Sequence, residues 1–402
     1  MTQQSPAQHV EPDTAAAVAL TQELVRLRTV NARDAVEIEA PAARVVESVM
    51  RGFGWDVSVQ EVAPGRPNVV GVITGTSAGR TLMFEGHTDV VTEGDPAAWS
   101  FDPFSGDIVD GRLLGRGSAD MKAGVAAMIH AARAVELGGF RGRIIVGALC
   151  DEEEMMIGAT AFAASPLAAG VDGVIVCEPE EGEICAISKG AMRVRIGVLG
   201  KMAHGAMPQH GRNPIPAVGR ILLGLQELGE QIAAGLGSHE YLGEFYLTPT
   251  VVQAGTIEQI NVIPAVASIA VDIRSIPGAD HGAVVHLIRR LTEQITDEAG
   301  LGSKIEVLVD RPVVDTPHGA PVVAALAAAH LDITGQQPVF GGVPGTTDGT
   351  ILSRDAGLST VVYGPGGKWI AHQVDEFVAV SQIEEATRVY ARAAQLFLAE
   401  ET

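Results

Sequence analysis

The sequence predicts an α/β protein with a smaller α+β domain inserted into it, and three observations lead to this prediction. In residues 1–188, short apolar strands alternate with amphipathic helices, as in α/β domains. In residues 189–309, apolar and polar positions alternate along the strands, which is typical of an antiparallel sheet with one exposed face. In residues 310–402, the pairing of helix and apolar strand returns. We therefore expect one domain built from the first and last segments and a second domain between them.

Each element is predicted from its own pattern. Helices are indicated by apolar residues at helical spacing; they are expected at Ala15–Arg28, Ala40–Gly52, Met121–Leu137, Ile215–Ala234, His281–Glu298 and Pro321–Thr334. Strands are indicated by β-rich runs bounded by Gly, Pro or Ser; they are expected at 57–62, 68–74, 81–86, 143–150, 173–178, 192–200, 247–255, 267–275 and 359–364.

Length and charge exclude several classes of protein. A chain of 402 residues is long enough for about two domains, and 47% apolar residues are enough to build large cores. The 28 Lys and Arg residues stand against 49 Asp and Glu residues, giving a net charge of -21. Such a field repels phosphate backbones and anionic lipid surfaces. We expect neither a nucleic acid nor a membrane as a partner.

The cysteines and the amino terminus indicate a cytoplasmic protein. The three cysteines, Cys150, Cys177 and Cys185, have apolar neighbours and are too few for a disulfide framework, which favours reduced, buried thiols. The first residues lack a basic stretch followed by an apolar one, and no run of 18 apolar residues occurs. We expect no signal peptide and no membrane span.

Acidic residues and histidines gather at the carboxyl ends of predicted strands, where open α/β sheets place their ligand sites. His87 and Asp89 follow the strand at 81–86, a run of acids at 151–154 follows the next apolar strand, and Glu178 ends another. Asp120 opens an Ala-rich helix and His372 follows a Gly-rich segment. Each has an ordinary structural interpretation when taken alone: His87 as a hydrogen-bonded histidine, Asp120 as a helix cap, the acidic run as a solvated turn.

Taken together, these residues indicate a metal site. Asp120, Glu153 and Glu178 would repel one another if they converged without cations. Two divalent ions and a hydroxide would neutralise three carboxylates. Imidazole and carboxylate ligands without cysteine suit zinc, cobalt or manganese better than calcium. We therefore predict two divalent ions, with Zn²⁺ favoured and Co²⁺ or Mn²⁺ as alternatives, in a hydrolytic site.

At this point the sequence resembles the M20 family of metallopeptidases and amidohydrolases over nearly its whole length. The matching segments are GHTDVVTEGDPAAWSFDPF, GRGSADMKAG, DEE with Gly158 and Ala159 after it, CEP, KMAHGAMPQHGRNPI, INVIPAVASIAVDIR, TTDG and AHQVDE. The resemblance implies a mixed-sheet, zinc-peptidase-like catalytic domain with an inserted lid and dimerisation domain, and therefore a homodimer.

The resemblance also implies roles for the clustered residues. Asp120 would bridge the two ions; His87 and Glu178 would complete one coordination shell, and Glu153 and His372 the other. Asp89 would orient His87.

Glu152 would be the general base that takes a proton from a metal-bridging water and returns it to the leaving amine. The extra acid Glu154 leaves a second register open, with Glu153 as base and Glu154 as ligand, although the spacing to Gly158 favours the first.

Three further positions match family residues near the substrate, and a glycine segment offers a fourth contact. His204 would reach a neighbouring active site across a dimer and help to hold the oxyanion, the alternative being a surface histidine. Asn261 and Arg274 would contact the substrate, and the fork of Arg274 suits a carboxylate, unless it forms an ion pair within its own domain. Gly366, within the Gly364–Gly367 segment, would lend a backbone amide to the same anion.

The predicted function is hydrolysis of an amide bond, of the N-acyl, N-carbamoyl or peptide-like kind, in a small molecule that carries a carboxylate. A dipeptidase or aminopeptidase of the same family is the nearest alternative. A catalytically silent protein that binds a small molecule or a metal is the alternative from another class; the presence of Glu152 argues against it.

Overall fold

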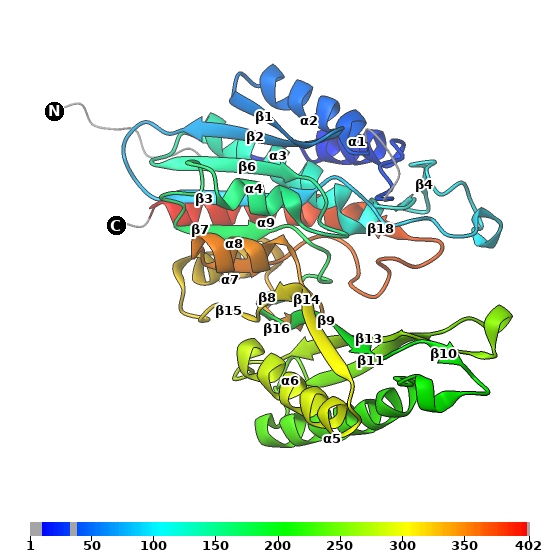
Figure 1. Ribbon diagram of the computed structural model, residues 1–402. Coiled ribbons are helices and arrows are strands. Elements are labelled where there is room, and N and C mark those ends of the chain that lie inside the picture. Colours follow the sequence, from blue (N-terminus) through cyan, green and yellow to red (C-terminus); the bar gives the residue numbers. More distant parts are fainter. Residues whose placement is uncertain (1–9, 33–37, 400–402) are drawn as a thin grey trace. The chain divides into compact units, whose positions relative to one another are not determined.

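The structure is a computed structural model that describes residues 10–32 and 38–399, and its contacts divide the chain into two compact units. The larger unit comprises residues 1–187, 316–342 and 347–402, and the smaller unit comprises residues 188–315 and 343–346. Figure 1 shows the helices and strands of both units. The role of the smaller unit as a lid or dimerisation domain stays a prediction.

In the larger unit, helices and strands alternate along the chain. Its helices are α1 (Thr14–Val25), α2 (Ala40–Gly52), α3 (Ala123–Gly138), α4 (Ile157–Ala163), α7 (Pro321–Thr334), α8 (Asp348–Ala356) and α9 (Val380–Ala399). Its strands are β1 (Asp56–Ala63), β2 (Arg66–Thr74), β3 (Thr81–His87), β4 (Ile108–Val109), β5 (Arg112–Leu114), β6 (Arg143–Leu149), β7 (Gly173–Val176), β8 (Ile184–Ser188), β16 (Phe340–Val343), β17 (Thr360–Val362) and β18 (Phe377–Ala379).

The main sheet of this unit is mixed. Its strands follow the order β1-β2-β6-β3-β7-β17-β8, with β16 also paired to β8. Strands β6, β3, β7 and β17 are parallel to one another, whereas β1 and β2 at one side and β8 at the other pair antiparallel with their neighbours. The α/β fold with a mixed sheet that the sequence predicts is confirmed.

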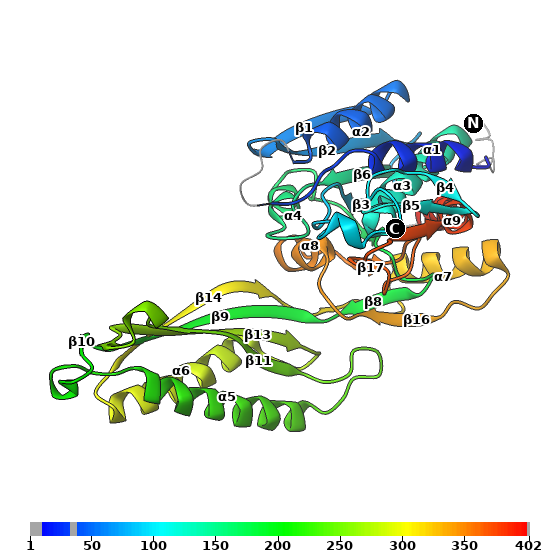
Figure 2. The ribbon, with the colours of Figure 1, turned by 90° about the vertical axis from the view of Figure 1, so that its right-hand side faces the viewer.

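Helices cover both faces of this sheet, so its central strands are buried throughout. All seven residues of β3 are buried. Side chains of α2, α3, α7 and α9 form one apolar core with alternate residues of the strands, and α4 and α8 lie on the other side (Figure 2). Gly124 lets α3 approach the sheet, because a Cβ there would lie 2.1 Å from the carbonyl oxygen of Cys177.

The parallel centre of the sheet brings three site segments to one edge. His87 is the last residue of β3, Asp151 to Glu153 follow β6, and Glu178 follows β7. Because neighbouring parallel strands end at the same edge, these segments lie side by side there. Of the remaining two ligand candidates, Asp120 lies in the short π-helical segment Ser118–Lys122, where its own dihedral angles are not helical, and His372 lies in a loop.

The smaller unit is an antiparallel sheet with two helices. Strands β9 (Gly190–Leu199), β11 (Tyr246–Ala254), β13 (Val266–Ser275) and β14 (Gly302–Arg311) pair in the order β11-β13-β9-β14. Helices α5 (Ile215–Leu236) and α6 (His281–Glu298) pack on them, and β10 (Ala203–His204) pairs with β12 (Val262–Ile263). The short strand β15 (Val314–Asp315) ends the unit. Buried and exposed residues alternate along β9 and β13, as expected for a sheet covered on one face.

The predicted elements agree with the structure within a few residues, and several further ones are present. Helix α6 and helix α7 begin and end as predicted, whereas α4, α8, α9 and β14 were not among the predictions. In the part of the chain that the structure describes, no helix is both long and apolar enough to cross a lipid bilayer.

Candidate metal centre

Asp120 lies between two histidines and faces each with a different oxygen. The Nε2 atom of His87 lies 3.1 Å from Oδ1 of Asp120, and the Nε2 atom of His372 lies 3.1 Å from Oδ2. The side chain of His87 is 1% exposed and that of His372 is 50% exposed, so the cluster reaches from the interior to the surface. A carboxylate placed in this way can join two ligand sets.

The two glutamates expected as ligands complete this arrangement. Glu178 places Oε1 3.4 Å from Nε2 of His87, and Glu153 places Oε2 3.1 Å from Nε2 of His372. The five residues His87, Asp120, Glu153, Glu178 and His372 are thus brought together from positions far apart in the sequence. Their role as metal ligands is a proposal that this geometry supports.

The spacing of these atoms fits divalent ions. Two ligand atoms that each lie ~2.1 Å from a tetrahedral zinc ion are ~3.4 Å apart, and the nitrogen–oxygen distances above are 3.1–3.4 Å. Two groups of three residues each bring one ligand atom per residue to within 4.8 Å of the others in the same group. One group is His87, Asp120 and Glu153, and the other is His87, Glu152 and Glu178. The residues therefore match the size and the chemistry of a site for nitrogen- and oxygen-bound cations.

Without cations, the charges in the cluster are balanced by protons. Burial alone would lower the pKa of His87, but Glu178, Asp120 and Asp89 together raise it well above its ordinary value. Hydrogen bonds to Asp120 and Glu153 raise the pKa of His372 to about 11. Burial, with the nearby Asp120 carboxylate, raises the pKa of Glu178 to about 8. Protons and cations would therefore compete for the same ligand atoms.

Glu152 lies beside this cluster, with its side chain largely buried. Burial raises the pKa of its carboxyl group well above the ordinary value, and the carboxylates of Glu178 and Glu153 add to that effect. A carboxyl group whose proton is held this strongly is suited to accept and return a proton near neutral pH. Among the described residues, the groups with metal-ligand spacing at this edge of the sheet include Glu152 and Glu153 and do not include Glu154.

Asp89 does more than the sequence suggested. The Nδ1 atom of His87 lies 2.9 Å from the backbone oxygen of Asp89 and 3.5 Å from its carboxylate, so the carbonyl is the nearer partner. The two carboxylate oxygens instead accept the backbone N–H groups of Glu152, at 3.2 Å, and of Glu153, at 3.3 Å. Asp89 therefore holds the turn that carries both glutamates.

A buried network behind Asp89 escaped the sequence reasoning. Nδ2 of Asn31 donates to Asp89 at 2.7 Å and to Asp151 at 3.0 Å. The Arg66 guanidinium pairs with Glu39 and with Asp151, and lies 4.0 Å from Asp89. The position of Arg66 at the start of a strand, next to Pro67, gave no sign of this role.

Gly366 lies next to the centre, at a place that only glycine fits easily. Its φ is +102°, and a Cβ there would lie 2.9 Å from the Cβ of Ala119, the neighbour of Asp120. Its carbonyl accepts the N–H of Glu181 at 2.9 Å. That its amide binds a substrate anion stays a prediction.

The other predicted substrate contacts belong to the smaller unit. His204 is exposed on β10, and its Nδ1 accepts the N–H of Ala206 at 3.0 Å. Asn261 is also exposed, and its carbonyl accepts the N–H of Gly205 at 2.6 Å. Arg274 on β13 donates through Nε to Asp272 at 2.9 Å. This ion pair within its own domain is the alternative role that the sequence left open for Arg274. Their roles toward a substrate stay predictions.

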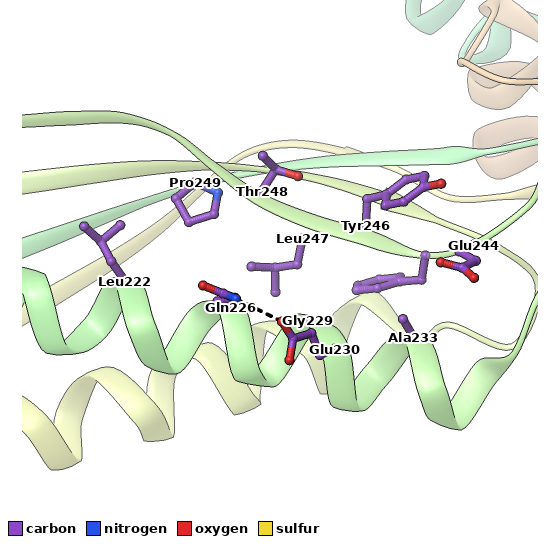
Figure 3. A pocket seen from close by; sticks show the side chains of 11 residues that line it. Leu222, Gln226, Gly229, Glu230, Ala233, Glu244, Tyr246, Leu247, Thr248 and Pro249 are labelled. Carbon is purple, nitrogen blue, oxygen red and sulfur yellow. Dashed lines mark hydrogen bonds between the residues drawn. The ribbon is translucent and has the colours of Figure 1, made fainter.

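A groove in the smaller unit contains none of the predicted site residues. It has a volume of about 400 Å³ and lies beside α5 and β11 (Figure 3). Its lining includes Leu222, Gln226 and Tyr246, with Gln226 hydrogen-bonded to Glu230 at 3.0 Å.

Comparisons with known proteins show the family of this chain. The model of peptidase family M20/M25/M40 matches residues 83–396. A succinyl-diaminopimelate desuccinylase of Cereibacter sphaeroides is 32% identical over 388 residues, covering 93% of this chain and 97% of that protein. The chain belongs to peptidase family M20/M25/M40.

Two solved structures have the same fold as this chain. The aminopeptidase PepT of Bacillus cereus has a TM-score of 0.76 at 20% identity, covering 97% of this chain and all of that one. The YXEP protein of Bacillus subtilis, a dinuclear metal-binding peptidase of family M20, has a TM-score of 0.72 at 18% identity, covering 96% of this chain and 98% of that one.

The family membership establishes the class of reaction. The protein is an enzyme, a hydrolase that cleaves amide bonds with the help of divalent metal ions. The prediction of a family M20 metal-dependent hydrolase is confirmed, and the catalytically silent alternative is wrong.

Proposed function

We propose that this enzyme hydrolyses the amide bond of a small N-acylated amino acid that carries a carboxylate. The single observation that supports the chemistry most strongly is the position of Asp120, whose two oxygens each lie 3.1 Å from a different histidine. The nature of the acyl group is supported by the Cereibacter sphaeroides relative, which is a succinyl-diaminopimelate desuccinylase. We therefore favour a short acyl group with its own carboxylate, such as succinyl.

Five residues would hold the two ions. His87 and Glu178 would bind one, His372 and Glu153 the other, and Asp120 both. Nitrogen and carboxylate oxygen ligands, without a thiolate, favour Zn²⁺, with Co²⁺ or Mn²⁺ as substitutes. When bound, two such ions lower the pKa of a water molecule and polarise the scissile carbonyl.

Glu152 would move the proton. Its carboxylate takes a proton from the attacking water and donates it to the nitrogen of the leaving amine, so that acid and amine are both released without a covalent enzyme intermediate. The burial of Glu152 supports this role, because its raised pKa holds the proton between the two transfers. Asp89 would keep Glu152 in place through the backbone of the turn.

Substrate recognition would fall to groups that donate hydrogen bonds to anions. The Arg274 guanidinium and the Gly366 amide are suited to a carboxylate, Asn261 to an amide or a carboxylate, and His204 to the oxyanion. Arg274 donates to Asp272 through Nε. Its terminal nitrogens would bind the substrate carboxylate, so one guanidinium would serve both partners.

A substrate panel tests the proposal. N-succinyl, N-acetyl and N-carbamoyl amino acids and dipeptides would be offered to the enzyme loaded with zinc, cobalt or manganese, and the released acid and amine quantified. We expect the N-succinyl compounds to have the highest kcat/KM, at least tenfold above any dipeptide. Faster release of free amino acids from dipeptides would favour the dipeptidase alternative instead.

Two neighbouring variants test the assignment of the acids. Glu152→Gln should retain both ions and lose turnover. Glu154→Gln serves as the matched control and should keep both metal content and activity. If Glu154→Gln lost metal and Glu152→Gln stayed active, the register with Glu153 as base would be correct.

We also propose that the enzyme is a cytoplasmic homodimer. The cytoplasmic location is supported by the three cysteines, which are free and buried. The dimer is supported by the predicted role of His204 in a neighbouring subunit; sedimentation at a concentration near the assay condition would test it.

A further inference from the structure

Glu376 is a buried acid that grips the backbone beside Asp120. It precedes β18, and its side chain is fully buried. One carboxylate oxygen accepts the N–H of Ala119 at 3.0 Å and that of Asp120 at 3.2 Å. Its own carbonyl accepts the N–H of Gly115 at 2.9 Å. The loop that carries Asp120 is thus fixed from the other end of the chain.

Arg116 connects this acid to the loop of His372. Its Nη1 donates to the second oxygen of Glu376, and its Nη2 donates to the backbone oxygen of His372 at 3.4 Å. The guanidinium carbon lies 5.2 Å from the ring centre of Trp99, and the side chain of Arg116 is 3% exposed. A planar fork with several donors, held against a ring, can serve two acceptors at once.

The backbone at His372 needs such support. Its φ is +63°, in the left-handed region that residues other than glycine rarely adopt. Its side chain is half exposed, so few packing contacts fix the imidazole from the solvent side. The hydrogen bond from Arg116 to the His372 carbonyl supports the backbone from which this ring reaches Asp120 and Glu153.

We infer that Arg116 and Glu376 form one positioning pair that holds Asp120 and His372 at the spacing two metal ions require. The inference rests on the proposed ligand assignment. Neither residue touches the ions or the substrate. The pair acts through the ligands: Glu376 fixes the backbone of the shared carboxylate, and Arg116 fixes the backbone of the more exposed histidine. The ion on the His372 side therefore depends on both residues, and the ion on the His87 side depends chiefly on Glu376.

The two residues should affect metal binding differently. Replacement of residues that orient metal ligands typically lowers metal affinity by ~10- to 100-fold. Arg116→Lys keeps the positive charge beside Glu376 and loses the planar fork that reaches two acceptors, so it should weaken binding of the ion on the His372 side by at least tenfold and leave the other binding event unchanged. Glu376→Gln replaces one of the two acceptor oxygens with an NH₂ group, which cannot serve both Arg116 and the two backbone N–H groups, so it should weaken both events.

A matched control is available on α3 in the same unit. Arg133 pairs with Glu136 and lies 5.0 Å from the ring centre of Phe53, so it repeats the combination of ion pair and aromatic ring. Glu136→Gln should change neither binding event. It controls for the general effect of weakening a partly buried ion pair in this fold.

Calorimetric titration of the metal-free, full-length protein with Co²⁺, together with the visible absorption of bound cobalt, measures both events directly. Thermal unfolding without metal is measured in parallel. A loss of one binding event with the other unchanged in Arg116→Lys, at a melting temperature close to that of wild type, supports the pair as a positioning device. Unchanged affinities in both variants, or equal losses of both events in Arg116→Lys, overturn it.

Two further arrangements keep the test decisive. If Glu376→Gln does not fold, Glu376→Asp replaces it, and this shortened acid should give the same pattern because it cannot reach both N–H groups. If the wild type itself binds fewer than two ions, the proposed ligand assignment fails, independently of how the variants behave.

Discussion

Metal binding to this enzyme should release protons, in a number that follows from the pKa values of the clustered side chains. The pKa of His372 is raised to about 11, so at pH 7 its imidazole carries one titratable proton. The pKa of Glu178 is raised to about 8, so at pH 7 its carboxyl group carries ~0.9 proton. The pKa of His87 is also raised well above its ordinary value. Metal ligation requires neutral imidazoles and an ionised carboxylate. Loading two ions should therefore release about two to three protons from these side chains.

The sign of the pH dependence follows directly. Because these pKa values are raised, the protons are bound at neutral pH and compete with the metal, so affinity rises with pH. Two released protons correspond to ~100-fold tighter combined binding of the two ions per pH unit. Above pH 9 the carboxyl group of Glu178 has already ionised, so the release should fall by about one proton.

Calorimetry in buffers of different ionisation enthalpy measures the number of protons released. The observed heat of binding varies linearly with the ionisation enthalpy of the buffer, and the slope gives that number. A proton lost by a bound water would add to the count, so about two is the lower limit at pH 7. In Glu178→Gln, whose amide carries no titrating proton, the count should drop by about one. A release below one proton at pH 7 would refute this account of the cluster.

Three further changes have definite expected outcomes. Glu152→Gln should lower kcat by ~10²- to 10⁴-fold without loss of metal, as measured by steady-state kinetics and metal analysis. Asp89→Asn should lower kcat and the melting temperature together, because an amide cannot accept the Glu152 and Glu153 N–H groups while also bonding Asn31. Each lost charge-assisted hydrogen bond is worth about 1.5–3 kcal/mol. An unchanged kcat would contradict this expectation. Gly124→Ala should destabilise the larger unit by about 1–3 kcal/mol or more in urea unfolding, since its Cβ would lie 2.1 Å from the Cys177 carbonyl oxygen.

The ligand candidates could be found from the sequence because local patterns place them. His87 and Glu178 follow apolar strands, and parallel strands end at a common edge, so convergence followed from the order of the elements. Asp120 and His372 do not follow apolar strands; they became candidates through the Ala-rich helix and the Gly-rich segment next to them, and the resemblance to family motifs then implied their roles. The paired arrangement of Asp120 with two histidines required the structure.

The residues that support the ligands could not be found in the same way. Arg116 and Glu376 are 260 positions apart; both lie in segments that match the family, GRGSADMKAG and AHQVDE, but neither segment indicates that the two residues pair. The same holds for Arg66 with Glu39 and Asp151. A buried ion pair forms only where the fold brings distant segments into contact, so neighbouring residues do not predict it. An acid at the end of a strand can be predicted from the strand that precedes it.

Glu152 and Glu153 are consecutive on one turn, and Asp89 anchors the N–H groups of both. The backbone spacing of these two acids is therefore set by the peptide chain. If Glu152 carries the proton and Glu153 binds an ion, as proposed, exchanging zinc for cobalt or manganese should change the Lewis acidity at the centre and leave the backbone that carries both acids unchanged. Differences in rate among these metals would then report the electronic character of the ion rather than a displaced carboxylate.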